Sequence, residues 1–69
     1  MQEHIDVEGR ITQALAGTMF RVELDNGHQL LAHISGKMRR RFIRLNIGDR
    51  VRLEMSPSNL NKGRIISRL

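Results

Sequence analysis

Short segments of alternating apolar and polar residues recur along the chain, and this alternation is typical of strands with one buried face. The segments cover residues 7–15, 20–24, 30–34 and 50–55, and a fifth begins at Gly63. In the first segment, one parity holds Val7, Gly9, Ile11, Gln13 and Leu15. The pattern predicts five short strands.

Turn-forming residues separate these segments. Asp25-Asn26-Gly27 lies between the second and third, and Asn-Gly favours a tight turn with positive φ, so we expect a hairpin there. Ala16-Gly17 is a weaker turn signal between the first two segments. Before the fifth segment, SPSNLNK (Ser56 to Lys62) contains the sole proline and predicts a loop.

A ten-residue stretch, SGKMRRRFIR (Ser35 to Arg44), departs from the alternation, and its five Lys and Arg residues are called the basic run below. On a helical projection its apolar residues share one arc, which predicts a helix of at most about three turns. Ser35 suits the N-cap of this helix and Gly48 its C-terminal end. The apolar arc holds Ile34, Met38, Phe42 and Leu45; the adjoining arc holds Lys37, Arg40, Arg41 and Arg44; Arg39 lies on the far side.

Five strands in 69 residues favour a closed barrel, because closure removes exposed strand edges. A helix between the third and fourth strands predicts the all-β, five-stranded Greek-key barrel of the oligonucleotide/oligosaccharide-binding (OB) fold. We expect one S1-like domain over residues 1–69, with residues 1–5 poorly ordered. An SH3-like barrel is the alternative, although it has no natural place for this helix.

Charge is the most informative feature of the composition. The chain has twelve Lys and Arg against seven Asp and Glu, a net charge of +5, and the basic run alone contributes five cations. No Asp or Glu occurs between Asp25 and Asp49. A block of one sign this dense predicts an anionic partner. Phosphate is the first candidate, ahead of an acidic lipid or an acidic protein.

Aromatic content limits which nucleic acid fits. Phe20 and Phe42 are the aromatic residues, and both lie on apolar parities. Barrels that bind single strands stack successive bases on exposed aromatic rings, and this chain offers no such platform. We therefore expect structured RNA, and RNA rather than DNA because no helix-turn-helix or zinc finger is present. Arginine, the main component of the basic run, grips phosphate and stacks on bases.

Catalytic, cofactor and metal chemistry is not expected. Cysteine is absent, and no nucleophile elbow, phosphate-binding loop or dinucleotide loop occurs. His28 and His33 lie an odd number of positions apart on one predicted strand, so they point to opposite faces and do not share a metal. We interpret Asp6 and Glu8 as exposed carboxylates near a terminus. Without cysteine, a signal peptide or a membrane segment, the sequence predicts a soluble intracellular protein.

The segment TMFRVELDNGHQLLAHISGKMRRRFIRLNIGDRV (Thr18 to Val51) closely resembles bacterial translation initiation factor one, and the match continues through NKGRI (Asn61 to Ile65). The resemblance implies a monomeric OB-fold protein of the cytoplasm or the plastid stroma. It implies binding to the small ribosomal subunit at the site later used by aminoacyl-tRNA, with contacts to ribosomal RNA of the decoding region. It also implies cooperation with initiation factors two and three.

The resemblance assigns roles to residues. Arg39 and Arg44 would engage nucleotides displaced from their stack. Phosphate contacts would fall to Lys37, Arg40 and Arg41. Residues 16–19 match a loop that the family inserts into an RNA groove. The further candidates for RNA contact are Gly17, Thr18, Met19, His28, His33 and Arg64.

The sequence departs from the family pattern in three places. Ala16-Gly17 stands where Pro-Asn is frequent, so this loop is expected to order at greater entropic cost. Phe42 replaces a common tyrosine, and Ser67 stands where an aromatic is frequent. Two other functions stay open: a general RNA-binding or RNA-chaperone barrel of cold-shock type, and a protein-interaction module that docks an acidic partner on the basic helix.

Overall fold

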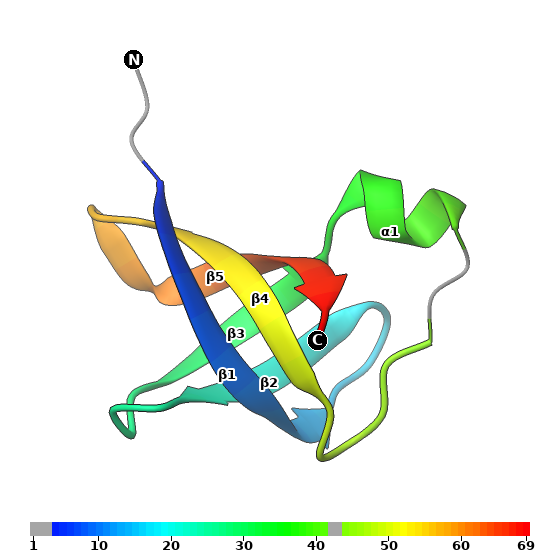
Figure 1. Ribbon diagram of the computed structural model, residues 1–69, viewed down its shortest axis with the longest axis horizontal. Coiled ribbons are helices and arrows are strands. Elements are labelled where there is room, and N and C mark those ends of the chain that lie inside the picture. The colour runs from blue at the N-terminus through cyan, green and yellow to red at the C-terminus, as the bar shows by residue number, and fades with distance from the viewer. Residues whose placement is uncertain (1–3, 42–43) are drawn as a thin grey trace.

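Strands and a helix follow one another along the chain in the predicted order (Figure 1). The computed structural model describes residues 4–41 and 44–69. Within these ranges the elements are β1 (Ile5–Ala14), β2 (Met19–Leu24), β3 (Gln29–Ile34), α1 (Gly36–Arg40), β4 (Arg50–Ser56) and β5 (Asn59–Arg68). No helix in the described part of the chain is long and apolar enough to cross a membrane.

The strands close into a barrel in the order β1-β2-β3-β5-β4. Closure comes from the antiparallel pairing of β1 with β4, in which Ile5 lies opposite Met55 and Arg10 opposite Arg50. β3 and β5 pair in parallel, and the other neighbours are antiparallel. A closed five-stranded barrel with a helix between β3 and β4 confirms the OB-fold prediction.

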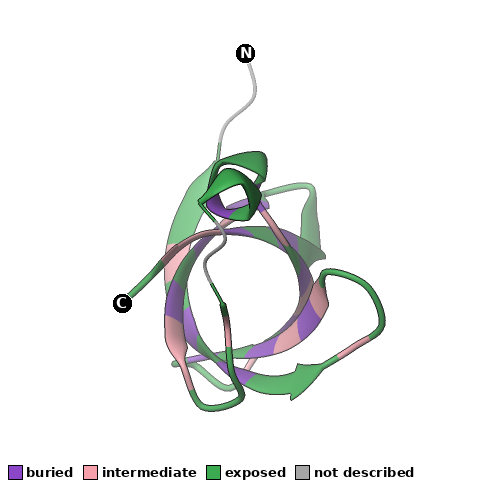
Figure 2. Ribbon diagram, turned by 90° about the vertical axis from the view of Figure 1, so that its right-hand side faces the viewer, coloured by how far each residue is buried: buried purple, intermediate pink, exposed green. Residues whose placement is uncertain are grey.

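The barrel interior is filled by apolar side chains from every strand, and Figure 2 shows these buried positions alternating around the ring. Met38 of α1 is 2% exposed and belongs to the same core, so the helix closes one end of the barrel as predicted. Leu45 and Ile34 pack against this core, whereas Phe42, the other predicted plug, lies outside the described residues. The core consists of Ile11, Phe20, Val22, Leu24, Leu30, Ala32, Met38, Val51, Leu53, Met55 and Ile65.

Helix α1 is shorter than the sequence predicts. Ser35 caps it as expected, but the last helical residue is Arg40 and Arg41 is the C-cap, so Gly48 does not end it. Gly48 instead has φ +96° in a separate turn. In that turn the carboxylate of Asp49 accepts a hydrogen bond from the amide of Asn46 at 2.9 Å. Side chains that bond nearby amides in this way favour a turn at residues 46–49.

The predicted loop before the last strand is also shorter in the structure. β5 begins at Asn59 rather than Gly63, and Ser56 pairs with Asn59 across a two-residue turn. Residues 59–62 are all exposed, so they show no apolar alternation. Backbone pairing to β4 and β3 holds them, as Lys62 opposite Leu31 shows. A strand segment whose side chains are all exposed leaves no trace in the hydrophobic pattern.

The turns predicted at Gly17 and Gly27 are confirmed, but the predicted alternation of side chains along β1 is interrupted. Gly17 and Gly27 adopt φ of +75° and +90° in the connections before and after β2. Within β1 the register with β2 shifts between Ile11 and Gln13, which leaves Gln13 exposed. Such a bulge adds one residue to a strand and turns the following side chains to the other face. At the other end of β1, Ile5 already pairs with Met55.

Candidate nucleic-acid interface

The segments that carry most of the candidate residues lie at one end of the barrel. Figure 1 shows α1, the connection between β1 and β2, and the chain leading to β4 at this end, which faces the viewer in Figure 2. Gly17 and Thr18 are exposed in the connection, and Met19 is half-buried at the start of β2. The cations Lys37, Arg39, Arg40, Arg41 and Arg44 are all exposed.

Carboxylates partner several arginines of the barrel wall but not the basic run. Asp25 accepts hydrogen bonds from Arg50 at 3.2 Å; this bond and the charge of Asp25 raise the pKa of Arg50 above its ordinary value. Over the described ranges, the ion pairs join Arg50 to Asp25 and Glu8, Arg52 to Glu8, and Arg64 to Glu54. Arg50, Arg52 and Arg64 of the barrel wall are therefore charge-compensated, whereas the five cations near α1 are exposed.

This segregation determines what the α1 end can bind. Like charges crowded on a short helix repel one another, and an anion placed among them relieves that repulsion. Arg39, Arg40, Arg41 and Arg44 each present a planar fork of donors that matches phosphate oxygens, and the same plane stacks on bases. The arrangement suits a polyanion with a defined surface, such as folded RNA.

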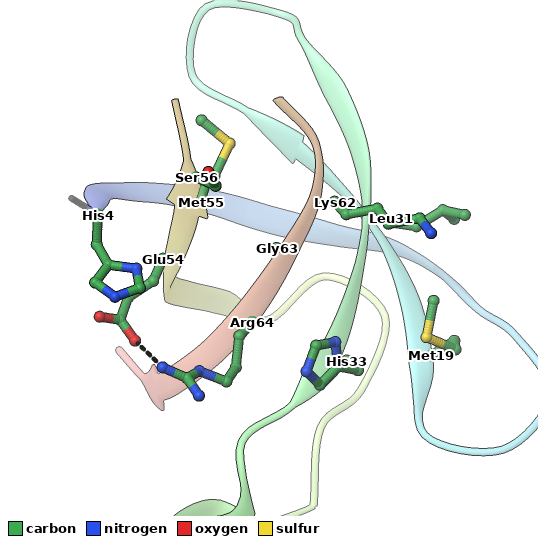
Figure 3. Close-up of a pocket in the computed structure, with 10 residues that line it drawn as sticks. All are labelled: His4, Met19, Leu31, His33, Glu54, Met55, Ser56, Lys62, Gly63 and Arg64. Carbon is green, nitrogen blue, oxygen red and sulfur yellow. Dashed lines mark hydrogen bonds and ion pairs between the residues drawn. The ribbon is translucent and has the colours of Figure 1, made fainter. Parts of the chain in front are cut away.

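A second group of candidates meets on the wall of the barrel. Met19 pairs with His33, and His33 pairs with Arg64, so neighbouring positions of β2, β3 and β5 bring the three side chains into one row. They line a depression of about 340 Å³ together with Leu31 and Lys62 (Figure 3). The apolar thioether and leucine beside exposed cations suit a base with its phosphate.

Arg64 differs from the other cations of the candidate set. Its Nη2 lies 2.9 Å from Oε1 of Glu54, its partner on β4 (Figure 3). The Arg64 side chain is still 48% exposed, and one guanidinium has donors left over after such a pair. Arg64 can therefore hold an anion while Glu54 orients it.

His28 is not brought together with the other candidates. It follows the turn between β2 and β3, at the end of the barrel away from α1 in Figure 1. Its Nε2 lies 2.6 Å from the carbonyl oxygen of Leu60, and its amide donates to Oδ1 of Asn26 at 2.9 Å. The bond to Leu60 ties the turn to β5, and the bond to Asn26 lies within the turn. No group of three His, Asp or Glu side chains in residues 4–41 and 44–69 could hold a metal ion.

Arg68 at the end of β5 is a residue that sequence reasoning missed. Its Nη1 donates to the carbonyl oxygen of Arg44 at 3.0 Å. It also lines a depression beside α1 that includes Lys37 and Arg41 of the basic run. A signal did exist, since Arg64, Ile66 and Arg68 share one parity of the last strand.

Comparison with known proteins agrees with the fold and identifies the family. Residues 1–69 match the family described as translation initiation factor 1A / IF-1. The chain is 53% identical to translation initiation factor one from the Wolbachia endosymbiont strain TRS of Brugia malayi. That solution structure superposes with a TM-score of 0.78 over 96% of this chain and 78% of the other.

A more distant similarity concerns part of a larger protein. YjeQ from Thermotoga maritima is 26% identical, with a TM-score of 0.75, and the match covers 94% of this chain but only 23% of that one. The same barrel thus occurs as one portion of a longer chain. The family match, by contrast, extends over the whole length of the sequence. The chain belongs to the translation initiation factor 1A / IF-1 family.

Proposed function

We propose that this translation initiation factor binds the small ribosomal subunit through the α1 end of the barrel, at the site later used by aminoacyl-tRNA. The observation that carries the proposal is the set of five exposed cations at one end of the barrel, which no carboxylate of the described residues pairs. Family membership supplies the ribosome as the source of the RNA. The ligand is ribosomal RNA of the decoding region.

The candidate residues have different roles in RNA binding. Arg39 and Arg44 engage displaced nucleotides, while Lys37, Arg40 and Arg41 neutralise phosphates. The connection at residues 16–18 lies at the same end of the barrel. In this proposal it enters an adjacent groove of the ribosomal RNA. Occupying this site keeps elongator tRNA out while initiation factors two and three assemble the start complex. The protein acts as a cytoplasmic monomer by binding alone, with neither a catalytic step nor a cofactor.

Co-sedimentation with purified small subunits tests the electrostatic part of the proposal. If about five phosphates are neutralised, the slope of log K against log salt is roughly −3.5 to −4.5. A fourfold rise in salt then weakens binding by roughly two orders of magnitude. Binding that does not change with salt would contradict a role for the basic run.

Chemical footprinting of the ribosomal RNA tests the location. We expect protection of decoding-region nucleotides, and protection elsewhere would overturn the proposed site. A preference for unstructured oligonucleotides over subunits would favour a general RNA chaperone. A partner complex that survives RNase treatment would favour a protein-interaction module.

A further inference from the structure

The turn between β2 and β3 contains the sequence Asn26-Gly27, at the end of the barrel away from α1 (Figure 1). Both residues are exposed, and Gly27 has φ +90°. The chain has three other asparagines, which are also exposed, and each of them precedes a residue with a side chain. They are Asn46 before Ile47, Asn59 before Leu60, and Asn61 before Lys62. Asn26 therefore differs from the others in the residue that follows it.

The residue after an asparagine determines how readily the side-chain amide is lost. In deamidation the backbone nitrogen of that residue gives up its proton and attacks Cγ of the asparagine. A new C–N bond closes a five-membered succinimide ring, the bond from Cγ to the side-chain nitrogen breaks, and ammonia leaves. Water then opens the ring at either carbonyl and gives aspartate or isoaspartate. Glycine favours the attack because it has no Cβ beside the nitrogen and its backbone rotates freely.

Hydrogen bonds within the turn restrain both reacting groups. The amide of Gly27, which is the nucleophile, donates to the carbonyl oxygen of Leu24 at 2.9 Å. Oδ1 of Asn26 accepts from the amide of His28 at 2.9 Å. Ring closure requires the Gly27 nitrogen to lose its proton and approach Cγ, so its bond to Leu24 must break first. The reaction therefore depends on opening of the turn.

Opening of this turn is opposed by few contacts. Nε2 of His28 lies 2.6 Å from the carbonyl oxygen of Leu60 on β5. The carbonyl oxygen of His28 accepts from the amide of Leu24 at 2.8 Å, which closes the hairpin. Residues 25–27 are exposed and His28 is half-buried, so the turn itself contributes no buried side chain. Segments with few buried contacts open locally while the rest of the fold stays intact.

We propose that Asn26 is a site of spontaneous deamidation, and that local opening of the turn between β2 and β3 determines its rate. Each event replaces a carboxamide by a carboxylate and lowers the net charge of +5 by one. The isoaspartate product also carries the main chain through Cβ, which lengthens the turn by one methylene group. The bonds that join Leu24 to Gly27 and His28 depend on the length of the turn, so the isoaspartate form loses them.

Peptide mapping by mass spectrometry of the full chain, incubated in mildly alkaline buffer, tests the site. We expect conversion at Asn26 to exceed that at the other three asparagines, which are internal controls. Gly27→Ala should slow the conversion, even though alanine is strained at this positive φ and loosens the turn. Gly48→Ala is the matched control: it introduces alanine at φ +96° without changing the residue after an asparagine, and should not slow the conversion. Equal conversion at all four asparagines, or an unchanged rate in Gly27→Ala, would overturn the site.

A second pair of variants tests the dependence on local opening. His28→Ala removes the bond to Leu60 and should raise the rate at Asn26 about fivefold, because the open turn becomes more frequent by that factor. Ser35→Ala removes the cap bond of α1, outside the turn, and should leave the rate unchanged. Equal acceleration by the two variants would show that the reaction needs global unfolding. Urea that unfolds the chain should raise the rate further, and a rate no higher than in the folded protein would contradict protection by the Gly27 bond.

The effect of the added methylene group is separated from that of the added charge by Asn26→Asp. This variant has the charge of the isoaspartate form and a main chain of ordinary length. The isoaspartate form is separated chromatographically from the incubated sample and identified by methyl transfer from an isoaspartate-specific methyltransferase. We expect its urea midpoint to lie below that of Asn26→Asp, and equal midpoints would contradict loss of the turn bonds. None of these measurements involves the ribosome, so they succeed or fail independently of the proposed function.

Discussion

The hydroxyl of Ser35 accepts a hydrogen bond from the amide of Met38 at 3.3 Å, and both side chains are buried. The bond satisfies one free amide at the start of α1, while the Met38 side chain enters the barrel core. A helix of five residues is unstable on its own, so it depends on contacts such as these two with the rest of the fold. The helix that presents Lys37, Arg39 and Arg40 of the basic run is thus positioned by the core.

Replacing Met38 should therefore destabilise the whole barrel. We expect Met38→Ala to lower the free energy of unfolding by about 2–5 kcal/mol, because it removes core contacts and leaves a cavity. Ser35→Ala should lower it by about 1 kcal/mol through loss of the cap. Urea denaturation measures both. Met38→Leu, which roughly conserves volume, is the control and should change stability by less than about 1.5 kcal/mol. An alanine variant as stable as wild type would show that α1 does not close the barrel.

Replacing glycine by alanine should have opposite effects on stability at two positions, Gly9 and Gly36. A Cβ at Gly9 of β1 would lie 2.7 Å from the carbonyl oxygen of Glu23 and 2.8 Å from Cγ1 of Val22. The carbonyl belongs to the paired strand β2 and cannot move freely, so Gly9→Ala should destabilise by about 1–3 kcal/mol. A Cβ at Gly36, the first residue of α1, meets nothing within 4 Å. Gly36→Ala should therefore stabilise by about 0.4–1 kcal/mol.

Thermal and urea unfolding of the two alanine variants check this pair. Gly36→Ala also serves as the control, since it adds the same methyl group where space exists. Equal stability changes in the two variants would mean that the close approach of β1 to β2 at Gly9 is not a constraint.

The strands that pack on the core could be predicted from the sequence, because their side chains alternate with burial. Val22 and Leu30 are examples, each buried and each flanked by more exposed positions. The start of β5 could not be predicted, since residues 59–62 are paired through the backbone and exposed on the surface. Hydrophobic alternation reports which side chains are buried and is silent on backbone pairing.

The candidate site, too, could be predicted only in part from the sequence. Charge segregation identified the basic run, because its five cations lie within ten consecutive residues. Arg68 was missed because it is 24 residues from the Arg44 carbonyl to which it donates. The parallel pairing of β3 with β5 places Ile65 opposite Ile34, and the pairing with β4 carries the strand on to Arg68 opposite Val51. Contacts of this kind depend on topology, which local spacing does not contain.

Alanine substitutions of the two candidate histidines should have different effects: one on stability, the other on subunit binding. His28→Ala removes the bond between Nε2 and the Leu60 carbonyl, and should lower the free energy of unfolding by about 0.5–1.5 kcal/mol. His33 is exposed in the wall depression, so His33→Ala should leave stability near wild type and weaken subunit binding. Urea denaturation and co-sedimentation measure the two effects. If His28→Ala instead weakens binding at unchanged stability, His28 contacts RNA, as its place among the candidate residues predicts.

Removing Arg39 or Arg44 should weaken subunit binding without affecting the fold. Both side chains are exposed, and the bond that Arg68 makes at Arg44 goes to a main-chain oxygen that Arg44→Ala keeps. We expect each alanine variant to remain within about 0.5 kcal/mol of wild-type stability. Loss of a charge-assisted contact should weaken subunit binding about tenfold. Arg52→Ala, whose side chain pairs with Glu8 on the barrel wall, is the matched control and should bind like wild type. A large loss of thermal stability in both Arg39→Ala and Arg44→Ala would instead assign these arginines a structural role.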